Sequence, residues 1–149
     1  MKASDWIARF LADRGVNVVF ELIGGMTTHL VDSIYRHGRS RLVTMHHEQA
    51  AALAACGWAQ MTGRPGVALA TSGPGAVNLL TGVATAYFDS IPAVFLTGQV
   101  NSGELSGGMS MRQLGFQETD VVSMAAPVTK GARQAQSAGE IPDLFRWAF

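Results

Sequence analysis

Residues 41–73, RLVTMHHEQAAALAACGWAQMTGRPGVALATSG, decide the fold class of this chain. The segment opens with a short apolar run, continues as an alanine-rich helical stretch over residues 48–63, and ends in a second apolar run that leads into a glycine turn. Apolar runs without alternation are typical of strands that are covered on both faces. Strand, helix and strand in this order predict a right-handed crossover and a parallel sheet.

The same alternation extends to both sides of this segment. Helices are predicted over residues 4–15, 26–38 and 76–90, and further strands over residues 16–25 and 93–100. Ser4 is the candidate N-cap of the first helix, and a short helix followed by a short strand near Val128 is expected later in the chain. We therefore expect an α/β domain with a parallel sheet flanked by helices on both faces. Residues 139–149 begin a helix that stops in mid-pattern, so the domain is expected to be truncated at its C-terminus and to lack its last strand.

The composition narrows the classes of partner. Among the 149 residues, 48% are hydrophobic and only 15% are charged, whereas charged residues usually make up about a quarter of a soluble domain. A chain this apolar is expected to have part of its surface covered by a partner protein. The formal net charge is zero and no Lys/Arg cluster is present, which argues against nucleic acid as the partner.

Membrane insertion and secretion are also not indicated. No apolar run reaches the roughly 18 residues that a membrane-spanning helix needs, and Asp5 and Arg9 stand where a signal peptide would have its apolar core. The single cysteine, Cys56, excludes an internal disulfide framework. A reducing, cytoplasmic location is therefore expected.

Four segments follow the predicted strands: residues 22–25 (LIGG), 45–49 (MHHEQ), 71–78 (TSGPGAVN) and the Gly- and Ser-rich loop over residues 99–115. In open α/β sheets, ligands bind beyond the carboxyl ends of the strands. The TSGPGAVN turn is similar to a phosphate cradle, but it lacks the lysine of a P-loop and the later acid of a dinucleotide fingerprint. Its glycines, Pro74 and the amide of Asn78 suit a flat polar ring better than a phosphate, and a turn without a ligand is the alternative.

Glu48 opens the alanine-rich helix. On spacing alone, an acid at this position can simply complement the helix dipole. The preceding histidines, His46 and His47, are adjacent in sequence and therefore point in different directions, which makes them a poor pair of metal ligands. No metal site is expected in this chain.

Taken together and in this order, the four segments resemble the N-terminal pyrimidine-binding (PYR) domain of thiamine-diphosphate-dependent enzymes. Residues 47–100, HEQAAALAACGWAQMTGRPGVALATSGPGAVNLLTGVATAYFDSIPAVFLTGQV, are similar to the most recognisable block of that family, and FQETD (116–120) and PVTK (127–130) continue the likeness. The resemblance covers essentially residues 1–149. It is strongest to the acetolactate synthase type, because the histidine pair of pyruvate decarboxylase-like members is absent from the loop after the fourth strand.

This resemblance implies a catalytic role for Glu48. In the family, the matching glutamate hydrogen-bonds N1′ of the cofactor's aminopyrimidine and favours the imino tautomer, which takes the proton from thiazolium C2. The activated cofactor attacks a 2-oxoacid, which loses carbon dioxide, and the fragment passes to an acceptor. A carboxylate with little water around it suits a strong hydrogen bond to a ring nitrogen.

The resemblance assigns further residues by position. The cofactor-binding residues that it implies are Pro74, Gly75, Asn78 and Gln117. Gly24, Gly25 and Phe116 are implied to lie near the reacting carbon, with ordinary packing as the alternative for Phe116.

The chain also departs from the family pattern, which puts the substrate in doubt. Leu22 and Ile23 replace the usual Tyr-Pro, His46 replaces an arginine, and the loop over residues 101–114 is longer than in typical acetolactate synthases. A 2-oxoacid decarboxylase of the same superfamily, and a non-catalytic fragment or separately encoded binding or regulatory subunit, remain as alternatives.

The expected partners follow from the parts that the chain lacks. In the family, a diphosphate-binding domain with a Gly-Asp-Gly motif holds the diphosphate and Mg²⁺, and residues 1–149 contain no such motif. The resemblance therefore implies Mg²⁺ bound through a domain outside this chain, the diphosphate-binding domain of a second subunit as partner, and a homodimer or homotetramer. A middle domain that binds FAD is compatible with the same pattern.

Overall fold

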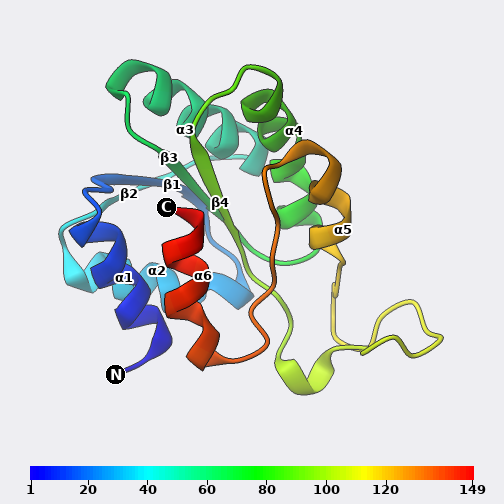
Figure 1. Ribbon diagram of the computed structural model, residues 1–149. Coiled ribbons are helices and arrows are strands. Elements are labelled where there is room, and N and C mark those ends of the chain that lie inside the picture. Colours follow the sequence, from blue (N-terminus) through cyan, green and yellow to red (C-terminus); the bar gives the residue numbers. More distant parts are fainter.

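The structure, a computed structural model that describes residues 1–149, contains a four-stranded parallel sheet with helices on both faces (Figure 1). The strand order is β2-β1-β3-β4. The strands are β1 (Val18–Leu22), β2 (Arg41–Thr44), β3 (Gly66–Ala70) and β4 (Ala93–Thr97). This arrangement confirms the predicted fold class.

The helices agree with the sequence pattern in order and approximate length. They are α1 (Ala3–Asp13), α2 (Thr28–His37), α3 (Glu48–Thr62), α4 (Pro74–Phe88), α5 (Val121–Ala125) and α6 (Ile141–Ala148). Short 3₁₀ turns cover η1 (Gly25–Thr27), η2 (Ser102–Glu104), η3 (Ala126–Val128) and η4 (Ala138–Glu140). No helix combines the length and the apolar character needed to traverse a bilayer.

Two local predictions were wrong. The strand expected near Val128 is the 3₁₀ turn η3, because Pro127 fixes a helical φ and lacks the N–H that a strand would use. Ser4 is not the N-cap of α1, since the helix already begins at Ala3 with Lys2 at the cap position. The Ser4 hydroxyl oxygen instead accepts a hydrogen bond from Ser33 on α2 at 2.9 Å.

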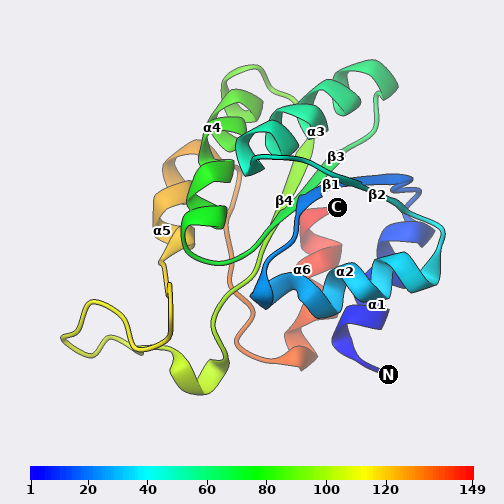
Figure 2. The same cartoon turned by 180° about the vertical axis from the view of Figure 1, so that it is seen from behind.

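The two faces of the sheet are filled by side chains of different size. Helices α1, α2 and α6 cover one face and α3 and α4 the other, as the two opposite views show (Figures 1 and 2). Strand β3 supplies both cores by simple alternation, with Val67 and Leu69 on the first face and Ala68 and Ala70 on the second. The second core is built mainly from alanine.

Small residues let α3 approach its neighbours closely. A Cβ atom built on Gly66 would lie 1.9 Å from the carbonyl oxygen of Ala55, and one built on Gly82 of α4 would lie 2.2 Å from the Cβ of Ala52. The thiol of Cys56 also reaches the Gly82 carbonyl oxygen at 3.6 Å. The alanine-rich sequence of α3 therefore sets how near this helix, with Glu48 at its start, sits to β3 and α4.

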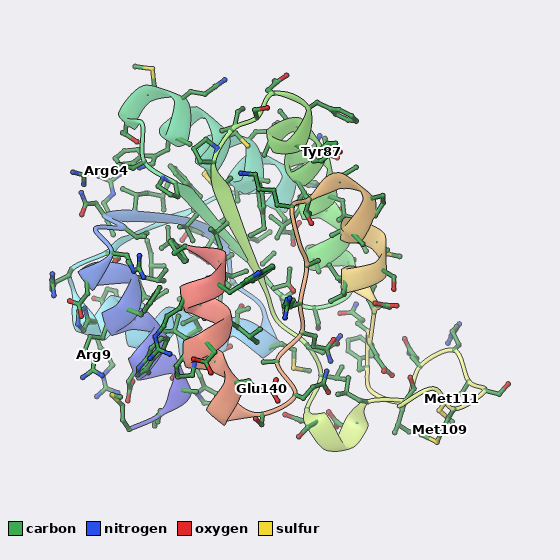
Figure 3. All side chains as sticks on the ribbon, viewed as in Figure 1. Arg9, Arg64, Tyr87, Met109, Met111 and Glu140 are labelled. Atoms are coloured by element: carbon green, nitrogen blue, oxygen red, sulfur yellow. The ribbon has the colours of Figure 1, made fainter.

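The register brings the carboxyl ends of all four strands to one edge. Glu21 pairs with Thr44, Leu22 with Ala70, and Ala70 with Thr97. The four segments that follow the strands therefore emerge side by side. The last of them is the predicted irregular loop, whose tip projects away from the body of the domain with Met109 and Met111 on it (Figure 3).

Candidate functional site

Close glycine contacts join the four segments at this edge. A Cβ on Gly24, after β1, would lie 2.5 Å from the Thr71 Cβ after β3. A Cβ on Gly73 would lie 2.6 Å from the Cβ of Gln117, which comes from the long loop after β4. The segments after β1 and β4 thus pack against the turn between β3 and α4, and the segment after β2 reaches the same turn through the Glu48 side chain, whose Oε1 would lie 3.1 Å from a Cβ on Gly75. The predicted gathering of distant segments at this edge is confirmed.

Glu48 occupies the first position of α3 and is only 8% exposed. His47 precedes it at the N-cap, where its Nδ1 accepts a hydrogen bond from the backbone N–H of Gln49 at 3.1 Å. This cap was missed in the sequence, because histidine is not among the preferred N-cap residues and no capping box is present. His46 is exposed and takes no part in the cap. The cap fixes the start of α3 and so the position from which the Glu48 side chain departs.

The amide of Asn78 orients the Glu48 carboxylate. Asn78 lies one turn into α4, and its Nδ2 donates a hydrogen bond of 2.9 Å to Glu48 Oε2. The other oxygen, Oε1, accepts no hydrogen bond within the chain and is thereby available to a ligand. A carboxylate held through one oxygen and free at the other can bond a ring nitrogen in a fixed direction.

Gly75 lies against this free oxygen, where the packing leaves no room for a side chain. A Cβ on Gly75 would lie 3.1 Å from Glu48 Oε1 and 2.8 Å from Thr71 Cγ2. Any larger residue at position 75 would therefore press on the carboxylate from the side of the turn. The turn backbone, Thr71 and the carboxylate are therefore closely packed, and glycine at position 75 leaves Oε1 unobstructed from this side.

Removal of the Asn78 amide is expected to leave Glu48 in place but badly aimed. If thiamine diphosphate binds at this edge, as the resemblance implies, Asn78→Ala in the complete protein should slow hydrogen–deuterium exchange at C2 of the bound cofactor about tenfold, the scale of one hydrogen bond to a charged group. NMR or mass spectrometry of the recovered cofactor measures this rate. Thr81→Ala, an exposed position one turn further along α4, is the matched control and should exchange at the wild-type rate. Equal rates in Asn78→Ala and wild type would contradict the orienting role.

Gln117 and Gly73 meet in unusual backbone conformations. Gly73, the N-cap residue of α4, has φ +62°, and Gln117 has φ +60°, in the left-handed region that favours glycine. Position 73 requires glycine for two reasons. Its φ is positive, and the Gln117 Cβ packs where a side chain at position 73 would lie. This contact places Gln117 at the same turn as Gly75 and Asn78.

Three other predicted residues at this edge, Gly25, Pro74 and Phe116, are exposed. A Cβ on Gly25 would meet no heavy atom within 4 Å. Phe116 is 73% exposed, so the alternative of ordinary core packing does not hold for it within this chain. Pro74 is exposed at the first position of α4, where its missing N–H has no cost.

A second buried carboxylate lies elsewhere. Glu21 on β1 is 2% exposed and accepts a hydrogen bond from the Thr44 hydroxyl across the β1–β2 pair. It alternates with Phe20 and shares the face of Val19, which packs under α1 and α2. Glu21 therefore faces the opposite side of the sheet from α3 and does not belong to the site. No group of three His, Cys, Asp or Glu side chains is arranged to hold a metal ion.

The carboxylate of Glu118 connects the two limbs of the long loop. We call the place where Ser106 and Leu114 come together the neck of the loop. Glu118 Oε1 accepts hydrogen bonds from the backbone N–H (2.8 Å) and hydroxyl (2.9 Å) of Ser106, and its Oε2 accepts one from the N–H of Leu114 at 2.9 Å. The hydrogen bonds from Leu114 and Ser106 hold the pKa of the Glu118 carboxyl below its ordinary value of 4.5. Sequence reasoning missed this residue, because the spacing of Ser106, Leu114 and Glu118 follows no regular pattern.

The lowered pKa of Glu118 predicts how the neck responds to pH. The stabilising effect of the charged form is fully present above about pH 4.5, the unfolded value, and is lost as pH falls through the lower folded pKa. Protection of the loop peptides against amide exchange, corrected for the intrinsic pH dependence of exchange, should therefore fall below that pH while the sheet peptides stay protected. Glu118→Gln should show no such step. An identical step in the variant would assign the transition to another group.

Comparison with known proteins adds independent information. Residues 1–124 match the family model described as thiamine pyrophosphate enzyme, N-terminal TPP binding domain. The chain is 42% identical over 149 residues to the acetolactate synthase isozyme 2 large subunit of Escherichia coli K12, an alignment that covers 100% of this chain and 26% of the relative. It is 43% identical over 149 residues to a probable acetolactate synthase large subunit of Methanocaldococcus jannaschii, with 24% of that protein covered.

A third relative gives the same proportions. The acetolactate synthase large subunit of Corynebacterium glutamicum is 41% identical over 149 residues, which is 100% of this chain and 23% of the relative. The chain thus spans about a quarter of the length of the curated relatives it matches.

Proposed function

Because the chain belongs to the thiamine pyrophosphate enzymes, as their N-terminal TPP-binding domain, we propose that it activates this cofactor, also called thiamine diphosphate, in an acetolactate synthase-like carboligase. The observation that carries the proposal is the Glu48 carboxylate, buried, held by Asn78 through Oε2 and free at Oε1. When bound, thiamine diphosphate supplies the electron sink that a 2-oxoacid needs in order to lose carbon dioxide.

Glu48 acts on the aminopyrimidine ring in this proposal. Its Oε1 would accept a hydrogen bond from N1′–H of the bound ring and so would hold a proton at that nitrogen. The low exposure of the side chain removes competing water and strengthens the bond. Gly75 and Pro74 form the wall on which the ring lies, and Asn78 contributes by fixing the carboxylate.

The remaining residues of the edge surround the ring and the reacting carbon. Gln117 approaches the pyrimidine from the long loop, over Gly73. Gly24 and Gly25 lie near the reacting carbon, where the Gly25 N–H is placed to meet developing negative charge, because the Gly24 N–H already donates to the Thr27 hydroxyl at 3.2 Å. Phe116, exposed in this chain, contacts the 2-oxoacid and excludes water from it.

The diphosphate end of the cofactor requires another part of the enzyme. We propose that the diphosphate-binding domain of a second subunit, with its Mg²⁺, completes the site in a homodimer or homotetramer. Helices α3 and α4 support this arrangement, since Glu48 is the one charged residue among their 30 positions. Large apolar side chains on these helices are exposed: Leu53, Met61, Val77, Tyr87 and Phe88. An FAD-binding middle domain and a cytoplasmic location complete the proposal.

A decarboxylase without an acceptor substrate is the second candidate. It is favoured by the apolar Leu22–Ile23 pair in place of Tyr-Pro and by the long loop after β4, because both lie at the edge where the substrate would enter. A non-catalytic subunit is disfavoured by the detailed placement of Glu48, since a silent module has no need for a buried carboxylate with one free oxygen.

Titration of the complete protein with thiamine diphosphate and Mg²⁺, followed by a screen of 2-oxoacids, tests the proposal. We expect saturable cofactor binding and release of carbon dioxide from at least one small 2-oxoacid. Formation of a carbon–carbon bond to a second 2-oxoacid identifies a carboligase, whereas release of the free aldehyde identifies a decarboxylase. Absence of cofactor binding by the complete protein would refute the proposal.

A further inference from the structure

Gln117 holds a backbone conformation that costs free energy. At φ +60° it lies in the left-handed region, which disfavours a residue with a side chain. Such a conformation persists only where the neighbouring structure enforces it. The Gln117 Cβ packs over Gly73, so a return to an ordinary φ would move this side chain away from the turn.

Most of the hydrogen bonds around Gln117 are local. The Thr119 hydroxyl donates to the Gln117 carbonyl oxygen at 3.2 Å, and the Glu118 N–H donates to the Gly115 carbonyl oxygen at 3.1 Å. Gln99, directly after β4, donates through Nε2 to the Thr119 carbonyl oxygen at 2.9 Å. These bonds fix the chain on either side of Gln117, but none of them reaches the outgoing limb of the loop around Ser106.

Glu118 supplies the connection across the loop. Its two carboxylate oxygens join Ser106, where the loop leaves the body of the domain, to Leu114, where it returns. A second bond between the two limbs, from the Gly115 N–H to the Glu104 carbonyl oxygen at 2.8 Å, lies beside this one. Between them, residues 107–113 form the tip that carries Met109 and Met111 (Figure 3).

From this geometry we propose that Glu118 is a positioning residue for the cofactor: it closes the loop neck and thereby holds Gln117 over the Gly73 turn, at the pyrimidine. The proposal rests on the proposed function, in which Gln117 faces that ring. It also explains how the chain accommodates a long loop at this edge. Because both limbs are tied to one carboxylate, the length of the tip has no effect on where Phe116 and Gln117 lie.

The other charged groups near the neck are engaged elsewhere or exposed. Glu104 accepts hydrogen bonds from Asn101, and Asp120 accepts them from Ser123 at the start of α5. Arg112 lies exposed on the tip and forms no ion pair. Glu118 is therefore the one carboxylate that spans the two limbs.

Two variants of the complete protein distinguish the effect of the neck from the effect of the tip. Glu118→Gln keeps the size of the side chain but cannot accept hydrogen bonds at both ends, since its Nε2 is a donor only. In the second variant, two glycines replace residues 107–113. Two residues are enough, because the amides of Ser106 and Leu114 both lie within 3 Å of the same carboxylate.

Cofactor binding is measured by calorimetry with thiamine diphosphate and, in parallel, with inorganic diphosphate, which has no pyrimidine. We expect Glu118→Gln to raise the Kd for thiamine diphosphate about tenfold and to leave the Kd for inorganic diphosphate unchanged. General damage to the fold would weaken both ligands. Amide exchange of the cofactor-free protein should be faster over residues 114–119 in this variant. The two-glycine variant should match wild type in both Kd values.

The outcomes are distinguishable from failure of the proposed function. An unchanged Kd for thiamine diphosphate in Glu118→Gln, an equal loss for both diphosphate ligands, or an equal loss in the two-glycine variant would each overturn the positioning role. The proposed function itself is tested separately by Glu48→Gln, which acts on C2 exchange at saturating cofactor. A normal effect of Glu48→Gln together with no effect of Glu118→Gln would therefore reject this inference alone.

Discussion

Glu48→Gln is expected to slow deuterium exchange at C2 of bound thiamine diphosphate by about 10²- to 10⁴-fold, the range of a lost acid–base partner. Glutamine occupies the same volume and can still receive the Asn78 amide through its oxygen. Its free end is then an amide donor in place of the carboxylate Oε1, and it cannot hold a proton at the ring nitrogen. The variant should therefore fold and bind cofactor while failing to activate it.

The control for this substitution is another carboxylate-to-amide change. Glu140, labelled at the start of α6 in Figure 3, accepts a hydrogen bond from the Gln136 N–H at 3.0 Å, on a surface segment between α5 and α6. In Glu140→Gln, deuterium exchange at C2 of the bound cofactor should proceed at the wild-type rate. Exchange within threefold of wild type in Glu48→Gln would contradict the role that we propose for Glu48.

A matched pair of glycine substitutions tests the packing that positions α3. Alanine is preferred over glycine in a helix by about 0.8–1 kcal/mol, so Gly57→Ala, in α3 with no heavy atom within 4 Å of the added Cβ, should stabilise the protein by about that amount. Gly82→Ala in α4 places the same methyl group 2.2 Å from the Ala52 Cβ. Overpacking should outweigh the helix preference and destabilise the protein by about 2 kcal/mol.

Urea unfolding of the complete protein, followed by far-UV circular dichroism, measures both effects as shifts in midpoint. We expect shifts of opposite sign. Because α3 and α4 carry Glu48 and Asn78, a separation of these helices in Gly82→Ala should also weaken cofactor binding. Stabilisation by Gly82→Ala would show that the two helices are not in the close contact described here.

The fold could be predicted from the sequence because the patterns that indicate its strands and helices are local and repeat along the chain. Each buried strand is a continuous apolar run and each helix has an apolar face, so the alternation of elements alone predicts the parallel sheet. The importance of the edge around Glu48 follows from the same pattern, since parallel strands place all their carboxyl ends together. Assignment of Glu48 to a pyrimidine nitrogen required the family resemblance, because spacing alone equally allowed an acid at a helix start.

What the sequence did not predict depends on contacts between distant residues. The hydrogen bond from Asn78 to Glu48 spans 30 positions and is set by the crossing of α3 and α4. The left-handed Gln117 has no sequence signal, since glycine is the residue expected there. Two local features were also missed: the cap at His47, because histidine is not a preferred N-cap residue, and the 3₁₀ turn at Val128, because the helical φ that Pro127 fixes was not taken into account.

The most direct test of the central claim, that Glu48 acts through N1′ of the pyrimidine, combines the protein variant with a modified cofactor. C2 exchange is measured in wild type and in Glu48→Gln, each saturated first with thiamine diphosphate and then with an analogue in which carbon replaces N1′. If Glu48 acts through that nitrogen, the substitution slows exchange with thiamine diphosphate but makes no difference with the analogue. An equal slowing with both cofactors would mean that Glu48 acts elsewhere, and would contradict the account.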